Sequence, residues 1–194
     1  MEPSPLRARI IETSLELAHE VGWEDVRLHA VAERVGLTLA EIGALFRDVD
    51  AIANAWFEQA LHAVQELPPE ALEGLPPPER LETVVMRWFD ALAPHREVTA
   101  QMLGQKLYLS HPHHWVPMVF DLSRLIHWFL DAARIGGTGR LRQAEEIGLT
   151  ALFVSTLAVW TRDASPAQER TRAFLRRGLA NSDRVLATFL RRRP

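Results

Sequence analysis

Cysteine is absent from the 194-residue sequence. Its absence excludes disulfide bonds, thiolate nucleophiles and cysteine-based zinc sites. No apolar run approaches the roughly 18 to 20 residues needed to span a bilayer. The N-terminal stretch MEPSPLRARI also lacks the basic segment followed by an apolar one that marks a secretory signal. Together these absences predict a cytoplasmic protein.

The short motifs of common catalytic sites are missing as well. The sequence contains no phosphate-binding loop, no GxGxxG, no HExxH and no GxSxG. The histidines of the segment HPHHW, His111, His113 and His114, have neither a cysteine nor a nearby carboxylate beside them, so we predict a solvated loop rather than a metal site. We therefore expect no enzymatic activity, no metal and no cofactor.

Strand-like alternation never persists, whereas apolar residues recur throughout at the i, i+3, i+4 spacing of amphipathic helices. This pattern predicts an all-α protein. Gly22 and Gly36 are expected to end the first two helices, and Thr38 with Glu41 forms a capping box for the third. Asp48 is placed to cap a longer fourth helix. The helices predicted in this part lie at about 10–21, 29–35, 39–46 and 52–64.

The proline-rich stretch ELPPEALEGLPPPER, residues 66–80, cannot continue a helix and marks a boundary. We predict a small head over residues 1–50, a connector helix to about residue 66, and a larger helical body over 67–194. The body helices are expected at about 79–93, 96–109, 115–133, 141–161 and 166–191.

Charge is distributed unevenly along the chain, whose formal net charge is −3. Residues 1–60 contain five arginines and eleven acidic residues, which gives −6. From residue 162 onward, nine arginines and three acidic residues give +6. The head is therefore acidic and the C-terminal end basic.

The head has an Arg-led first helix, EVGW at the turn after it, VAERVGLT for the first helix of a helix-turn-helix, and LF before the connector. In these features it resembles the head of the TetR family of bacterial transcriptional regulators. This resemblance implies a TetR-like homodimer that binds operator DNA through the head and an apolar small molecule in the body. The residues predicted to contact DNA are Arg7, Arg9, Arg27, Arg34, Thr38, Glu41 and Arg47.

The sequence departs from that family's DNA-binding pattern. At the positions where the family has phosphate-contacting Tyr, His and Lys, this chain has Gly43, Leu45 and Val49. On the reading face only Thr38 and Glu41 can hydrogen-bond to a base edge. Because phosphate contacts depend on Lys and Arg, an acidic head starts with an electrostatic penalty.

A second resemblance leaves an alternative open. GW at 22–23, LFR at 45–47 and STLAVWTRDASPAQERTRAFLRRGL at 155–179 are similar to the coenzyme-Q biosynthesis lipid-binding proteins, which share the TetR-like fold without reading DNA. This likeness implies an isoprenoid lipid in the body and a C-terminal amphipathic helix that touches the membrane. The basic last helix agrees with such peripheral contact.

Two residue sets in the body are candidate sites. Aromatic, Met and His residues predict an apolar ligand pocket, lined by Trp88, Phe89, Met102, Trp115, Met118, His127, Trp128 and Phe153. The helix GLTALFVSTLAVW is apolar on nearly all sides, and with the last helix it predicts a two-fold contact between protomers. The interface residues are expected to be Phe153, Leu157, Trp160, Phe174, Leu175, Leu179 and Leu186.

Overall fold

The computed structural model describes residues 4–106, 112–136 and 140–191, without the side chains of 106–120, 140, 141, 144 and 182–191. All regular elements in this part of the chain are helical, which confirms the all-α prediction. None of its helices is long and apolar enough to cross a membrane. The elements are α1 (Pro5–Val21), η1 (Trp23–Asp25), α2 (Leu28–Val35), α3 (Leu39–Leu45), α4 (Val49–Gln65), η2 (Pro69–Leu72), α5 (Pro77–Leu92), η3 (Ala93–His95), α6 (Arg96–Lys106), α7 (Pro112–Ala132), α8 (Arg140–Trp160), η4 (Pro166–Gln168) and α9 (Glu169–Arg191).

Most predicted helix ends lie close to the observed ones, and the differences have local causes. Helix α5 begins at Pro77, two residues before the predicted start, because proline is tolerated in the first turn. Helix α9 begins at Glu169, three residues later than predicted. The turn before it holds Ala167 and Gln168 in the left-handed region, with φ of 47° and 58°, which an α-helix cannot include.

The chain forms two compact units. The first contains residues 1–61 and 92–115, and the second contains residues 62–91 and 116–194. Helix α6 therefore belongs to the same unit as α1, α2 and α3. The functional boundary that we predict near residue 66, after a head of residues 1–50, stays a prediction.

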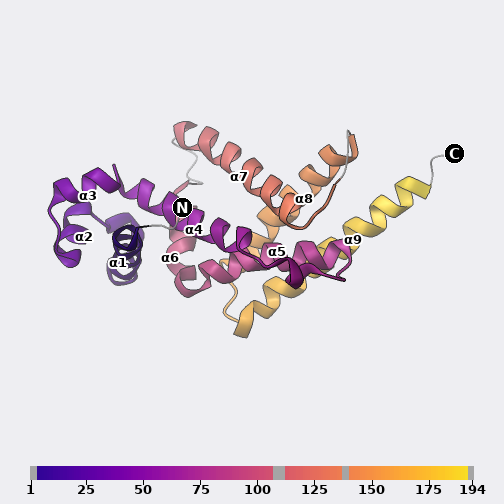
Figure 1. Cartoon of the computed structure of the whole chain (residues 1–194), viewed down its shortest axis with the longest axis horizontal. Helices are drawn as coiled ribbons and strands as arrows, with labels where there is room; N and C mark the ends of the chain where they lie inside the picture. Colours follow the sequence, from indigo (N-terminus) through magenta and orange to yellow (C-terminus); the bar gives the residue numbers. More distant parts are fainter. Residues whose placement is uncertain (1–3, 107–111, 137–139, 192–194) are drawn as a thin grey trace. The chain divides into compact units, whose positions relative to one another are not determined.

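The first unit is built around a core shared by α1, α2 and α3 (indigo in Figure 1). Ile10, Val31 and Ile42 are fully buried in this core. Side chains of α6 accept hydrogen bonds from η1 and α4. The Trp23 backbone N–H donates to Gln101 Oε1 at 2.7 Å, and Trp56 Nε1 donates to Thr99 Oγ1 at 2.9 Å.

A row of three polar side chains joins α1 to η3 within the first unit. His19 Nε2 lies 3.0 Å from His95 Nδ1, and His95 Nε2 lies 3.1 Å from Glu12 Oε1. The edge of the Trp56 ring packs against His95, with ring centroids 5.6 Å apart. These contacts fix the start of α6 against the first helix.

The second unit has an aromatic core. Trp88 and Phe89 of α5 contact Phe153 of α8, with ring centroids 5.4 and 5.7 Å apart. Phe129 of α7 and Trp160 of α8 complete the cluster. All five side chains are at most 3% exposed, so the cluster is a close-packed interior.

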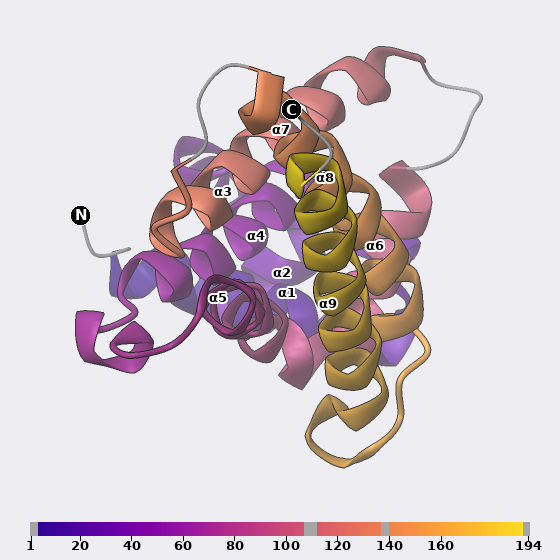
Figure 2. The same ribbon diagram turned by 90° about the vertical axis from the view of Figure 1, so that its right-hand side faces the viewer.

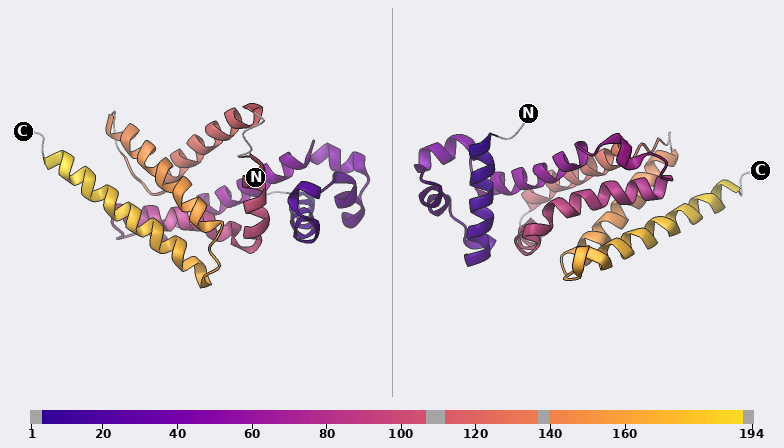
Figure 3. Two further views of the ribbon diagram at one scale, coloured as in Figure 1. Left: turned by 180° about the vertical axis from the view of Figure 1, so that it is seen from behind. Right: turned by 60° about the horizontal axis from the view of Figure 1, so that its bottom comes forward.

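Helices α8 and α9 lie side by side and antiparallel (Figures 2 and 3). At Gly178 of α9, an added Cβ would collide with the Leu152 side chain of α8. Glycine at this position therefore allows the two helices to pack at short range.

A buried carboxylate connects the end of α8 to the start of α9. Asp163 is 1% exposed and accepts hydrogen bonds from the backbone N–H groups of Ser165 and Thr171, at 2.9 and 2.8 Å, and from both hydroxyl groups. Burial by itself raises the pKa of Asp163, but the hydrogen bonds from Ser165 and Thr171 outweigh it and hold the pKa well below its usual range. Asp163 therefore remains ionised inside the protein.

We expect Asp163→Asn to lower the free energy of unfolding by about 3 kcal/mol, because an amide group cannot accept all four hydrogen bonds. Since the folded-state pKa is depressed, the stabilisation by the carboxylate is present above about pH 4 and is lost as the pH falls through the folded-state pKa. Urea unfolding at pH 7 measures the first effect, and the same measurement continued down to about pH 2 follows the second. Asp121→Asn, at an exposed position, is the control and should change the free energy of unfolding by less than about 0.5 kcal/mol. An equal loss of stability in the two variants would contradict the stabilising role of the Asp163 carboxylate.

Candidate nucleic-acid interface and ligand pocket

Helices α2 and α3 form a helix-turn-helix in the first unit. Helix α2 ends at Gly36, whose φ of 80° and ψ of 36° place it in the left-handed conformation that favours glycine. The chain then turns into α3, and the predicted capping box is confirmed. Thr38 Oγ1 accepts from the Glu41 backbone N–H, and the Glu41 carboxylate accepts from the Thr38 backbone N–H at 2.8 Å.

The exposed side of α3 has few groups that can read bases. Leu39 is 55% exposed, and Ala40, Gly43 and Ala44 are exposed beside it. The Thr38 hydroxyl also donates to Glu41 at 2.7 Å, so the cap occupies both hydrogen-bonding side chains. The backbone N–H and then the hydroxyl of Thr38 lower the pKa of Glu41, which keeps it negatively charged. The reading helix therefore presents a small, apolar and anionic surface.

Three of the predicted phosphate-binding arginines have acidic partners. Arg34 makes two hydrogen bonds to Glu20, of 2.7 and 2.9 Å. This interaction lowers the pKa of Glu20 and raises that of Arg34. Arg47 Nε donates to the neighbouring carboxylate of Asp48 at 2.9 Å. Arg27 lies 3.6 Å from a carboxylate oxygen of Asp25 and also donates to two backbone carbonyls.

The remaining two arginines lie on α1. Arg7 donates to the Leu45 carbonyl at 2.8 Å, and its guanidinium lies 4.2 Å from the centroid of the Phe46 ring. Arg7 therefore holds the end of α3 against α1. Arg9 is exposed and has no acidic partner among the described residues. Four of the five arginines thus have an intramolecular partner, which the sequence did not indicate.

The residues predicted to line an apolar pocket fall in both compact units, and the pocket itself stays a prediction. Trp88, Phe89 and Phe153 fill the aromatic core of the second unit, whereas Met102 is buried in the first unit. Trp128 is 41% exposed, and His127 Nε2 lies 3.0 Å from Glu146 Oε1. The side chains of Trp115 and Met118, like the HPHHW loop, lie outside the described residues. Within the described part of the chain, no group of His, Asp and Glu side chains could hold a metal ion.

The residues predicted at a dimer interface separate into two kinds. Phe153, Trp160, Leu175 and Leu179 are at most 7% exposed within a single chain. They pack inside the single chain, and their place in a dimer interface stays a prediction. Leu157 and Phe174 are partly exposed, and the Leu186 side chain lies outside the described residues. The surface of α8 also has an exposed apolar stripe at helical spacing, which was not among the predicted residues. It consists of Ile147, Ala151, Val154 and Ala158.

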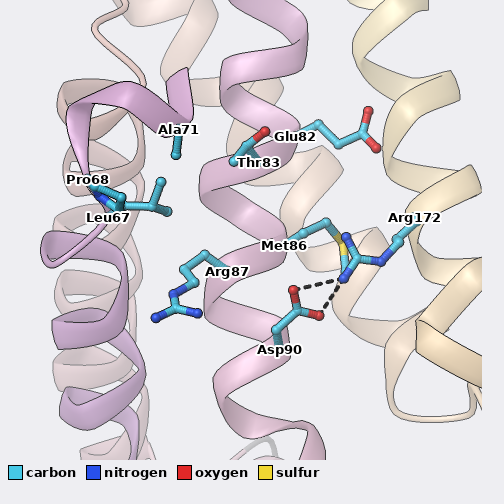
Figure 4. Close-up of a pocket in the computed structure, with 9 residues that line it drawn as sticks. All are labelled: Leu67, Pro68, Ala71, Glu82, Thr83, Met86, Arg87, Asp90 and Arg172. Atoms are coloured by element: carbon cyan, nitrogen blue, oxygen red, sulfur yellow. Dashed lines mark hydrogen bonds and ion pairs between the residues drawn. The ribbon is translucent and has the colours of Figure 1, made fainter. Parts of the chain in front are cut away.

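A pocket of about 360 Å³ lies elsewhere in the second unit (Figure 4). One face of α5 forms its floor, and the segment from Leu67 to Ala71 forms one wall. Arg172 of α9 closes the other side, where it binds Asp90 with two hydrogen bonds of 2.6 and 2.8 Å. No sequence motif indicates this pocket, because its lining comes from three segments far apart in the chain.

Comparisons with known proteins agree with this architecture. The family model described as COQ9 matches residues 146–185, which cover most of α8 and the first part of α9. A TetR transcriptional regulator from Nitrosomonas europaea ATCC 19718 is similar over 91% of this chain and 97% of its own, with 36% identity and a TM-score of 0.82. No curated protein sequence matches the chain.

Two more distant structures share the fold. A TetR transcriptional regulator from Rhodococcus sp. RHA1 is 18% identical over 90% of this chain and 94% of its own, with a TM-score of 0.66. The fatty acid degradation regulator FadR from Bacillus halodurans is 14% identical over 92% of this chain and 97% of its own, with a TM-score of 0.57. Fold and site together define a helix-turn-helix protein with a larger helical body. The chain belongs to the TetR family of transcriptional regulators.

We expect Thr38→Ala to lower the free energy of unfolding of the first unit by about 1 kcal/mol, since the substitution removes the N-cap of α3. Amide hydrogen exchange should show the largest loss of protection in α3. Thr161→Ala is a matched control, because its hydroxyl donates only to the Ala158 carbonyl at the end of α8. Unchanged exchange in α3 would show that the capping box does not hold this helix.

Proposed function

We propose that this protein is a ligand-responsive transcriptional regulator that binds DNA through α3 and the arginines of its first unit. The observation that carries the proposal is the 36% identity, over 91% of the chain, with a TetR transcriptional regulator. The helix-turn-helix with an intact cap on α3 supports it. We further propose that the protein acts as a homodimer through α8 and α9, and that an apolar small molecule bound in the body changes its affinity for an operator.

The ion pairs of the first unit affect how such a protein binds DNA. Arg34 must exchange Glu20 for a phosphate, and Arg47 must exchange Asp48. Each exchange replaces one exposed ion pair by another, so its net gain is small. Arg9 has no acidic partner among the described residues, so it can bind a phosphate without breaking an ion pair. We therefore propose weak, mainly phosphate-directed binding in which acidic side chains compete with DNA.

This mechanism predicts that Glu20→Gln strengthens DNA binding, since it frees Arg34 and removes a negative charge. We expect the dissociation constant for duplex DNA to fall about two- to fivefold. Arg9→Ala should weaken binding and reduce the slope of log affinity against log salt by about 1. Fluorescence anisotropy between about 50 and 200 mM salt measures both quantities.

Glu73→Gln is the control for Glu20→Gln, because it removes the same charge from an exposed position in the second unit. It should leave the dissociation constant unchanged. If neither the wild-type protein nor Glu20→Gln binds DNA at about 50 mM salt, the regulator proposal is wrong.

A second candidate function is supported by the COQ9 match over residues 146–185 and by the paired arginines of the first unit. In this alternative the protein binds an isoprenoid lipid in its body, reads no DNA and contacts the membrane through α9. Arg172 and Arg176 of α9 are paired with Asp90 and Glu82. Arg170 and Arg177 are exposed, which leaves them available to anionic headgroups.

For this candidate we expect the protein to float with vesicles that contain phosphatidylglycerol, but not with vesicles of phosphatidylcholine alone. Arg177→Gln should lower the partition coefficient about fivefold, because each basic residue near an anionic surface contributes about 1 kcal/mol. Asn181→Gln, an exposed and uncharged position of the same helix, should have no effect. Absence of flotation with either type of vesicle would exclude membrane contact.

A further inference from the structure

The pocket of the second unit combines an apolar floor with charged ends (Figure 4). Met86 lies at the floor, and Leu67, Pro68 and Ala71 form one wall. Its volume of about 360 Å³ falls in the lower part of the range of small-molecule sites, about 300 to 1,000 Å³. The space therefore fits a small molecule with a short apolar body.

Most of the charges that line this pocket cancel in pairs. Arg172 is neutralised by Asp90, and its Nε donates to the Ala167 carbonyl at 2.9 Å. Glu82 is neutralised by Arg176 through hydrogen bonds of 2.7 and 3.0 Å. Both pairs are held on the α9 side of α5. They leave no net charge on that side of the pocket.

Arg87 is the exception among the described lining residues. It is exposed, it has no acidic partner in the described part of the chain, and it points toward the segment from Leu67 to Ala71 (Figure 4). Its Nε donates to the Ala63 carbonyl, in the last turn of α4, at 3.2 Å. This bond fixes the plane of the guanidinium, and the two terminal nitrogens remain available as donors. An oriented guanidinium with two free nitrogens matches the geometry of a carboxylate.

We propose that this pocket is a binding site for a small carboxylic acid. Arg87 binds the carboxylate, and Met86 with Leu67 and Pro68 covers the apolar body. The Asp90–Arg172 pair forms a rigid opposite wall, because Gln168 Nε2 also donates to Asp90 Oδ1 at 2.6 Å. The site goes beyond the proposed function, since it contains none of the residues predicted for DNA, ligand or dimer contact.

Isothermal titration calorimetry of the full-length protein with octanoate tests this assignment, with octanol and octylamine as probes that lack the carboxylate. We expect saturable octanoate binding and none with the other two probes. Arg87→Gln should weaken octanoate binding about tenfold or more, because it removes a charge-assisted hydrogen-bonding pair. Ala71→Trp leaves Arg87 intact and should abolish binding by filling the pocket.

Arg162→Gln is the matched control. Arg162 is also an exposed arginine of the second unit that donates to one backbone carbonyl, that of Ala158 at 3.0 Å, but it does not line the pocket. The Arg162→Gln variant should bind octanoate with the same affinity as the wild-type protein. The proposal is overturned if octanoate binds more weakly than about 10 mM, or if Ala71→Trp, folded by its thermal midpoint, binds it as the wild type does.

Discussion

The second unit depends on a buried polar corner where α8 passes into α9. Asp163 is buried away from solvent, so its charge is stabilised by the four hydrogen bonds that it accepts from Ser165 and Thr171. The corner continues through Gln168, which accepts from Trp160 Nε1 at 2.5 Å and donates to Asp90. Side chains of α5, α8 and α9 are thereby joined in one network. The left-handed backbone at Ala167 and Gln168 persists because these bonds hold it.

Secondary structure was largely predictable because its causes are local. Gly36 and the Thr38–Glu41 capping box act within a few residues of each other, and the structure has both where the sequence placed them. The start of α9 was predicted three residues too early. The reason is that a hydrogen bond from Gln168 to Asp90, 78 residues away, stabilises a conformation that sequence spacing does not reveal. Long-range contacts of this kind also determine that α6 is part of the first unit.

The candidate sites were harder to predict because they depend on which charges meet. The sequence shows five arginines and eleven acidic residues in its first 60 positions, but not that Arg34 binds Glu20 across α1 and α2. It shows aromatic residues in the body, but not that Trp88, Phe89 and Phe153 fill one another's space. Composition therefore indicated which kinds of interaction to expect. Which residues pair with each other could be seen only in the folded structure. The pocket at Arg87 illustrates this, since no single segment contains a binding motif.

The short distance between α8 and α9 at Gly178 has a mechanical consequence. Leu152 occupies the place where a side chain at position 178 of α9 would stand, so a shift of one helix along the other would have to move Leu152 out of this place. We therefore expect α8 and α9 to move together, because the Asp163 corner also joins them at one end.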